Sequence, residues 1–190
     1  MRWEGLFADL EAQAGALAQA ERAAEVDERT RAEVGRLGVA ERLRGALGLP
    51  VRLRLPAGLT VAGELRRVGP DWLLLGDGDA RETIVALPAV LGVRGLARFS
   101  AAPGTAGVVE SRLTLRHALR GVARDRSAVR VHLVDGATVD ATVDRVGADF
   151  VEVATHAAGE PRRRGDVRDS ELVPLAALAA VRRSADAVTT

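Results

Sequence analysis

Apolar and polar residues alternate with a period of two over several short stretches of the chain. In VRLRL, residues 51–55, valine and leucine alternate with arginine, and VRVHL at 129–133 repeats the pattern. Successive side chains of a strand point to opposite faces, so we expect the apolar ones to be buried and Arg52 and Arg54 to face water. A glycine follows each stretch, where a tight turn needs a positive φ. The pattern predicts short antiparallel strands.

A different pattern, typical of a helix, covers residues 3–33. Most of these residues favour helices, and apolar side chains recur at spacings of four and three residues. This spacing predicts an amphipathic helix whose apolar side needs a partner, supplied by folding back or by self-association. The apolar positions are Trp3, Phe7, Leu10, Ala14 and Leu17.

The chain also contains an internal repeat. Residues 51–75 and 129–153 align without gaps, with ten identities in 25 positions. The likeness continues from 83–95 to 171–183 after about ten extra residues in the second copy. The repeated unit is predicted to be a helix followed by about five strands. The expected organisation is an N-terminal helix (1–35), a first copy (36–97), a linker (98–107), a second copy (108–184) and a tail (185–190).

Composition narrows the class of protein. All 27 basic residues are arginine, and the absence of cysteine excludes disulfides and thiolate metal sites. The net charge is only +1, but residues 36–130 hold 16 arginines against 8 acidic residues. The longest mostly apolar stretch, 172–181, is too short to span a bilayer, so we expect a cytoplasmic protein without a membrane partner.

The arginines are the main candidates for binding an anionic partner. A helix expected over 108–126 carries four of them at spacing four, within an arc of about 120°. Such a row could contact phosphates, and the alternative is a solvated helix face. The loop PRRRG, 161–165, is a further basic candidate, again with a solvated loop as the alternative. The predicted nucleic-acid-binding residues are Arg112, Arg116, Arg120, Arg124, Arg52, Arg54 and Arg66.

Two aromatic residues occupy equivalent places in the two copies. Trp72 and Phe150 each follow an aspartate, Asp71 and Asp149. Both aromatics are candidates for stacking on a base, and the alternative is packing in the core. The aspartates are expected to order the turn by accepting backbone N–H bonds.

Nothing in the sequence favours an enzyme. The histidines 117, 132 and 156 lack the spacing of a zinc site, and no phosphate-cradling glycine loop occurs. We therefore expect no catalytic residues, no metal and no cofactor.

One family resemblance emerges from the residues of the first copy. The residues that carry it are Leu55, Gly58, Val61, Gly63, Leu65, Val68 and Asp71. Their pattern resembles the first signature of the Sm and LSm small barrels, including the bacterial Hfq type, and VALPAVLGV (85–93) looks like their fourth and fifth strands. The chain is also similar to the Sm-like C-terminal domain of bacterial ribosome maturation factors. The base-contacting Asn of the Sm signature is missing after Asp71, and Leu87 and Pro88 stand where Hfq-type proteins have a Lys-His pair.

The resemblance implies a fold and a class of function. The expected fold is mainly β with helices: two tandem Sm-like five-stranded small barrels, each preceded by a helix, plus the N-terminal helix. The expected function is non-enzymatic binding of nucleic acid, RNA before DNA. The alternative is a protein-interaction or assembly module that docks a partner through the N-terminal helix. Unpaired strand edges also predict a homo-oligomer.

Overall fold

A computed structural model describes residues 3–78, 81–96, 112–155 and 169–183. The chain divides into two compact units, Met1–Gly38 and Val39–Thr190. The predicted linker 98–107, the loop 161–165 and the tail 185–190 lie outside the described residues. No helix among the described residues is long and apolar enough to cross a membrane.

The first unit is built on helix α1 (Trp3–Val34), which confirms the predicted N-terminal helix. The side chains of Trp3, Phe7, Leu10 and Leu17 are exposed, from 51% for Leu10 to 76% for Trp3. The apolar stripe covers only the first half of the helix, and ion pairs such as Glu25–Arg29 stabilise the second half. A protein partner for this helix stays a prediction.

The second unit contains all the described strands. Its helices are α2 (Val39–Arg44) and α3 (Leu115–Asp125), with short 3-10 helices η1 (Pro56–Gly58), η2 (Leu87–Ala89) and η4 (Leu175–Ala177). Its strands are β1 (Pro50–Arg54), β2 (Thr60–Val68), β3 (Trp72–Asp77), β4 (Arg81–Ala86), β5 (Gly92–Arg94), β6 (Ala128–Leu133), β7 (Thr138–Val146), β8 (Phe150–Thr155), β9 (Asp169–Pro174) and β10 (Leu178–Arg183).

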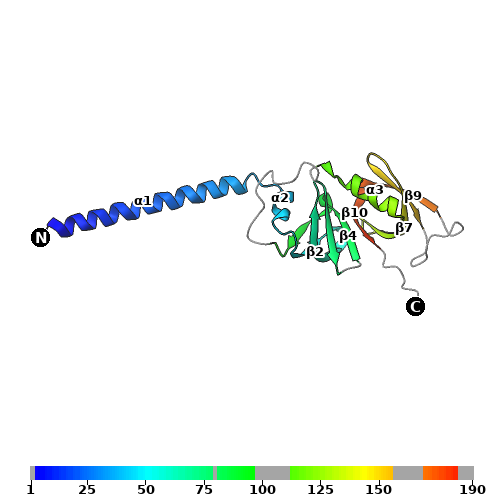
Figure 1. Ribbon diagram of the computed structural model, residues 1–190, viewed down its shortest axis with the longest axis horizontal. Helices are drawn as coiled ribbons and strands as arrows, with labels where there is room; N and C mark the ends of the chain where they lie inside the picture. The colour runs from blue at the N-terminus through cyan, green and yellow to red at the C-terminus, as the bar shows by residue number, and fades with distance from the viewer. Residues whose placement is uncertain (1–2, 79–80, 97–111, 156–168, 184–190) are drawn as a thin grey trace. The chain divides into compact units, whose positions relative to one another are not determined.

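The strands form one open antiparallel sheet, so the expectation of two closed five-stranded barrels is wrong. The strand order is β5-β1-β2-β3-β4-β10-β6-β7-β8-β9. The two copies meet where β4 pairs with β10, with Val85 opposite Ala180 and Ile84 opposite Val181. This pairing uses the edges of both copies to join them into a single sheet (Figure 1). The outer strands are β5 and β9.

The internal repeat is visible in the topology. In each copy the fifth strand lies beside the first, β5 beside β1 and β10 beside β6. The remaining strands follow in chain order, and the second strand of each copy has a register shift, after Leu65 in β2 and after Val143 in β7. The two halves of the sheet therefore share one arrangement.

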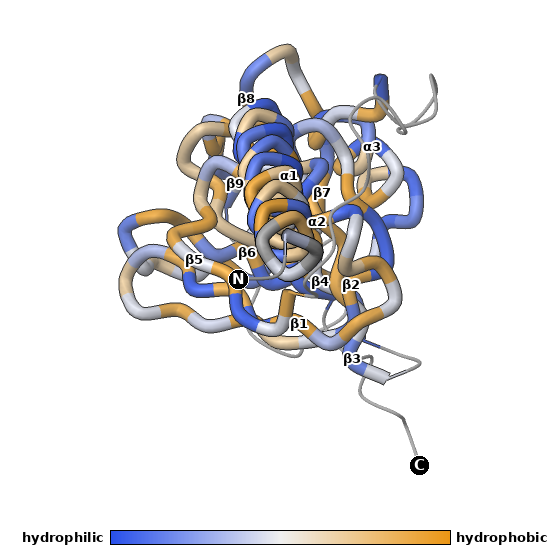
Figure 2. Tube along the Cα trace, turned by 90° about the vertical axis from the view of Figure 1, so that its left-hand side faces the viewer, coloured by the Kyte–Doolittle hydropathy of each residue, from blue (hydrophilic) through white to orange (hydrophobic). Residues whose placement is uncertain are grey.

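The alternation along the strands places the core as predicted. Val51 and Leu53 are 3% and 0% exposed, whereas Arg52 and Arg54, which alternate with them along β1, are exposed. Hydrophilic and hydrophobic residues follow one another closely along the strands in Figure 2. The two cores also interlock, because Ala180 of β10 packs into the core of the first copy.

Helix α3 lies against β7 and buries Leu115 and Leu119 (Figure 1). It begins at Leu115, whereas the sequence predicted a helix from residue 108. Residues 108–111 are outside the described ranges, and Thr114 precedes the helix in an extended conformation. The predicted arginine row is therefore α-helical only from Arg116 onward.

Candidate anion-binding site

Three of the predicted arginines lie along α3. Arg116, Arg120 and Arg124 are four residues apart, which places them within about 80° around the helix axis. Arg120 and Arg124 are exposed, and Arg124 donates to the backbone oxygen of Arg120 over 3.3 Å. Arg112, which precedes the helix, is also exposed. The row is a basic strip on one side of α3.

Arg116 differs from the other arginines of this row. It is half-buried because it lies next to the face of α3 that contains Leu119, which packs in the core. Its Nε is buried and has no hydrogen-bond partner. A guanidinium in this position keeps its other N–H groups for solvent or a ligand.

A second group of arginines surrounds a hollow beside the outer edge of the sheet. Arg52 and Arg54 of β1 and Arg94 of β5 line it, and Arg52 stands directly opposite Arg94 in the strand register. The hollow has a volume of about 430 Å³ and is completed by Thr60, Gly92 and Val93. We call the residues Arg52, Arg54 and Arg94 the arginine hollow.

No carboxylate among the described residues forms an ion pair with the arginine hollow. Arg54 donates from Nη2 to the backbone oxygen of Leu91 over 3.4 Å, which is a neutral partner. Glu64 lies on β2 opposite Pro50 and pairs with none of the three arginines. Like charges held this close repel one another, so a bound anion would be favoured here.

The second copy has the same positions with the charge neutralised. Arg130 corresponds to Arg52, and its Nε and Nη2 donate to the two carboxylate oxygens of Asp140 over 2.8 and 3.0 Å. This hydrogen bond and the charge of Asp140 raise the pKa of Arg130. Asp140 lies directly opposite Arg130, whereas the residue opposite Arg52 is Ala62. This one difference between the copies therefore leaves Arg52 without an acidic partner among the residues that the structure describes.

The other two positions of the second copy are also less basic. His132 corresponds to Arg54, and burial, followed by the charge of Arg130, lowers its pKa. Arg182 corresponds to Arg94 and lies 3.9 Å from a carboxylate oxygen of Asp77. Only the first copy presents this set of arginines without acidic partners among the described residues.

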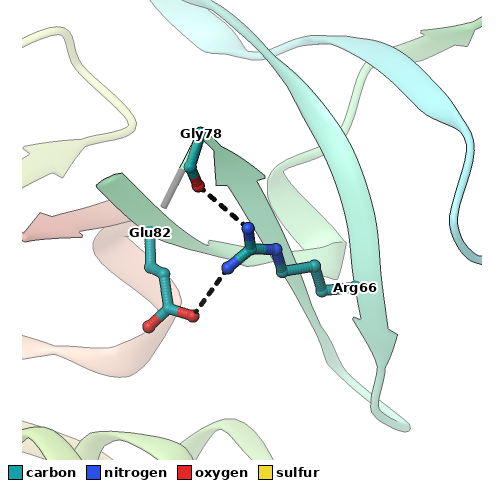
Figure 3. Close-up of polar contacts among 3 residues, drawn as sticks. All are labelled: Arg66, Gly78 and Glu82. Atoms are coloured by element: carbon teal, nitrogen blue, oxygen red, sulfur yellow. Dashed lines mark hydrogen bonds and ion pairs between the residues drawn. The ribbon is translucent and has the colours of Figure 1, made fainter. Parts of the chain in front are cut away.

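Arg66, another predicted binding residue, is engaged within the first copy. Figure 3 shows its guanidinium between the backbone oxygen of Gly78, at 2.9 Å, and Oε1 of Glu82, at 3.4 Å. These contacts join β2 to Gly78, which directly follows β3, and to Glu82 of β4. Arg66 is not part of the arginine hollow, and a role in binding stays a prediction.

Trp72 and Asp71 connect the two copies. Trp72 is 8% exposed, packs over Gly69 and donates from Nε1 to the backbone oxygen of Leu113 over 2.6 Å. The carboxylate of Asp71 accepts the backbone N–H of Leu115, the first residue of α3, over 2.7 Å. Base stacking on Trp72 would require these contacts to open. The sequence suggested that Asp71 orders its own turn, but its carboxylate holds the start of α3.

The equivalent pair in the second copy has no such partner. Phe150 is half-buried and packs over Gly147, as Trp72 packs over Gly69. Asp149 is exposed, and its carboxylate makes no hydrogen bond or ion pair to a described residue. A stacking role for Phe150 stays a prediction.

Sequence reasoning missed Arg94 as a member of the hollow. The alternation of Arg52 and Arg54 identified their shared face, but β5 has only three residues and shows no periodicity of its own. The available signal was the repeat, since Arg94 aligns with Arg182, the last residue but one of β10.

Comparison with known proteins adds no relative to this picture. No protein-family model, curated protein or solved structure matches the chain at a significant level. The resemblance to Sm proteins therefore stays an interpretation of the sequence, and the function is argued from the site.

Proposed function

We propose that this protein binds nucleic acid, RNA before DNA, by contacting backbone phosphates at the arginine hollow. The observation that carries the proposal is the difference between the copies. Arg52, Arg54 and Arg94 lack acidic partners among the described residues, whereas Arg130 at the corresponding position is held by Asp140. The first copy is thus the one equipped to receive an anion.

The chemistry of the side chains suits phosphate. A guanidinium presents N–H donors in a planar fork that matches two phosphate oxygens, and its charge persists at any physiological pH. Each phosphate that it neutralises releases counterions, so affinity falls as salt rises, with a slope of roughly 0.7 per contact for a single strand. The exposed arginines of α3 offer a second surface of the same chemistry.

The test is a fluorescence-anisotropy titration of labelled single-stranded RNA and duplex DNA at several salt concentrations. For the double variant Arg52→Ala, Arg54→Ala we expect weaker binding and a salt slope lower by roughly 1.4, because two phosphate contacts are lost. Unchanged affinity and slope in this variant would refute the arginine hollow as the binding surface. The variant Arg116→Glu, Arg120→Glu measures whether the α3 row contributes.

A sharper version leaves every arginine in place. Ala62→Asp copies the arrangement of the second copy by placing a carboxylate opposite Arg52, so we expect it to weaken binding. Thr138→Asp is the matched control, since it adds the same charge to an exposed position of β7 in the second copy. Equal losses for both variants would mean that only net charge matters.

A further inference from the structure

The outer strands of the sheet, β9 and β5, correspond to the two strands that pair at its centre. β9 is the fourth strand of the second copy, as β4 is of the first, and β5 is the fifth strand of the first copy, as β10 is of the second. The pairing of β4 with β10 therefore shows, within one chain, how these two kinds of edge fit together.

We propose that β9 of one molecule pairs antiparallel with β5 of a second copy of this chain. The repeat fixes the register: Ile84 opposite Val181 becomes Leu172 opposite Val93, and Thr83 opposite Arg182 becomes Glu171 opposite Arg94. This contact concerns a different partner from nucleic acid, and of the arginine hollow it uses only Arg94.

The exposure of Leu172 supports this pairing. Leu172 is 57% exposed on the outer strand, although its counterpart Ile84 is half-buried and packs against the core that contains Val181. An outer strand that carries a large exposed apolar side chain favours pairing with a further strand. Val93 of the neighbouring molecule would cover Leu172.

The charges of the two edges are complementary. Glu171 of β9 would stand opposite Arg94 of β5, and opposite charges directly across a strand pair stabilise it. Arg94 would gain an acidic neighbour, while Arg52 and Arg54 remain one strand further inside the sheet. The two arginines tested for nucleic-acid binding are thus not the ones that this pairing uses.

Asp149 provides a second, independent observation. Its counterpart Asp71 accepts the N–H of Leu115 beside the β4–β10 pairing, but Asp149 is exposed without a partner among the described residues. RLGVAERLRG (36–45) aligns with RLTLRHALRG (112–121), so Val39 takes the place of Leu115. A neighbouring molecule paired through its β5 would bring the backbone N–H of its Val39 toward the carboxylate of Asp149 in the first molecule.

Such a contact joins two different surfaces, so every molecule carries both halves of it. Repetition of this contact gives a closed ring or an extending filament. This property distinguishes the proposal from self-association through α1.

Cross-linking tests the register directly, because the chain has no cysteine. The variants Leu172→Cys and Val93→Cys are prepared separately, mixed without nucleic acid and oxidised mildly. We expect a disulfide-linked dimer from the mixture and not from either variant alone, since only the mixed pair faces each other. Equal cross-linking of one variant with itself, or none in the mixture, would overturn the proposal.

Light scattering between about 1 and 100 µM tests whether the contact forms without cross-links. We expect the wild type to exceed monomer mass, and Leu172→Asp to reduce association at least tenfold. Leu47→Asp is the control, because Leu47 is exposed and lies in neither edge strand. Glu171→Arg and Arg94→Glu are each expected to weaken association up to roughly fivefold, and their combination to restore it. A monomer throughout this range, or equal losses in Leu172→Asp and Leu47→Asp, would overturn the proposal whatever the nucleic-acid titration shows.

Discussion

Replacing Asp71 with alanine tests whether this residue of the first copy holds the start of α3 in the second copy. The carboxylate of Asp71 accepts the backbone N–H of Leu115 over 2.7 Å, so a residue of the first copy holds the start of a helix in the second. Thr114, at the usual capping position, makes no side-chain bond to the helix backbone, and its hydroxyl contacts His117 instead. Asp71 is therefore the capping residue of α3.

The expected size of the effect follows from that role. Loss of a helix-capping side chain costs about 0.5 to 2 kcal/mol, and a hydrogen bond to a charged group contributes about 1.5 to 3 kcal/mol. We expect Asp71→Ala to lower the free energy of unfolding by about 1 to 2 kcal/mol. Asp71→Asn keeps an acceptor but removes the charge at the helix start, so it should lose about 0.3 to 1 kcal/mol.

Urea unfolding followed by tryptophan fluorescence measures these changes. The chain has two tryptophans, so a Trp3→Phe background leaves Trp72, which lies at the same contact, as the only probe. Asp149→Ala is the matched control, and in dilute monomeric protein it should change the free energy by less than about 0.5 kcal/mol. Equal losses in Asp71→Ala and Asp149→Ala, or no loss in either, would refute the capping role.

Two further predictions concern single side chains. Burial lowers the pKa of His132, so the unfolded chain takes up a proton more readily than the folded one, and the free energy of unfolding should fall as the pH drops below about 6.5. Urea midpoints measured at several pH values should show this fall, and the variant His132→Asn should show a smaller one. A Cβ at Gly69 would collide with the ring of Trp72, so Gly69→Ala should lower the urea midpoint, and Gly147→Ala should lower it less because Phe150 is only half-buried; equal midpoints for both would contradict this reasoning.

The strands and the buried face could be predicted from the sequence because alternation decides which side chains point inward. Val51, Leu53 and Val131 are buried as this rule requires. The rule does not specify which strand edges meet. Pairing of Val85 with Ala180 joins residues far apart in the chain, and no local pattern distinguishes that arrangement from closure of each copy on itself.

The candidate site was predictable only in part for the same reason. Arg52 and Arg54 follow from local alternation, whereas the missing acidic partner depends on which residue stands across the ladder, Ala62 or Asp140. That difference is visible in an alignment of the copies once the register is known. Trp72 could not be assigned from sequence, because its partner Leu113 belongs to the other copy.

The position of β10 has a consequence for how the protein is made. It is the last described strand in the chain, yet it lies at the centre of the sheet between β4 and β6. While the ribosome is still adding the residues that precede Leu178, β4 and β6 each present an edge that no other described strand covers. A chain that stops before β10 is therefore left with two unpaired strand edges, which are sites of aggregation and of chaperone binding. Completion of one short segment converts both halves into folded protein together.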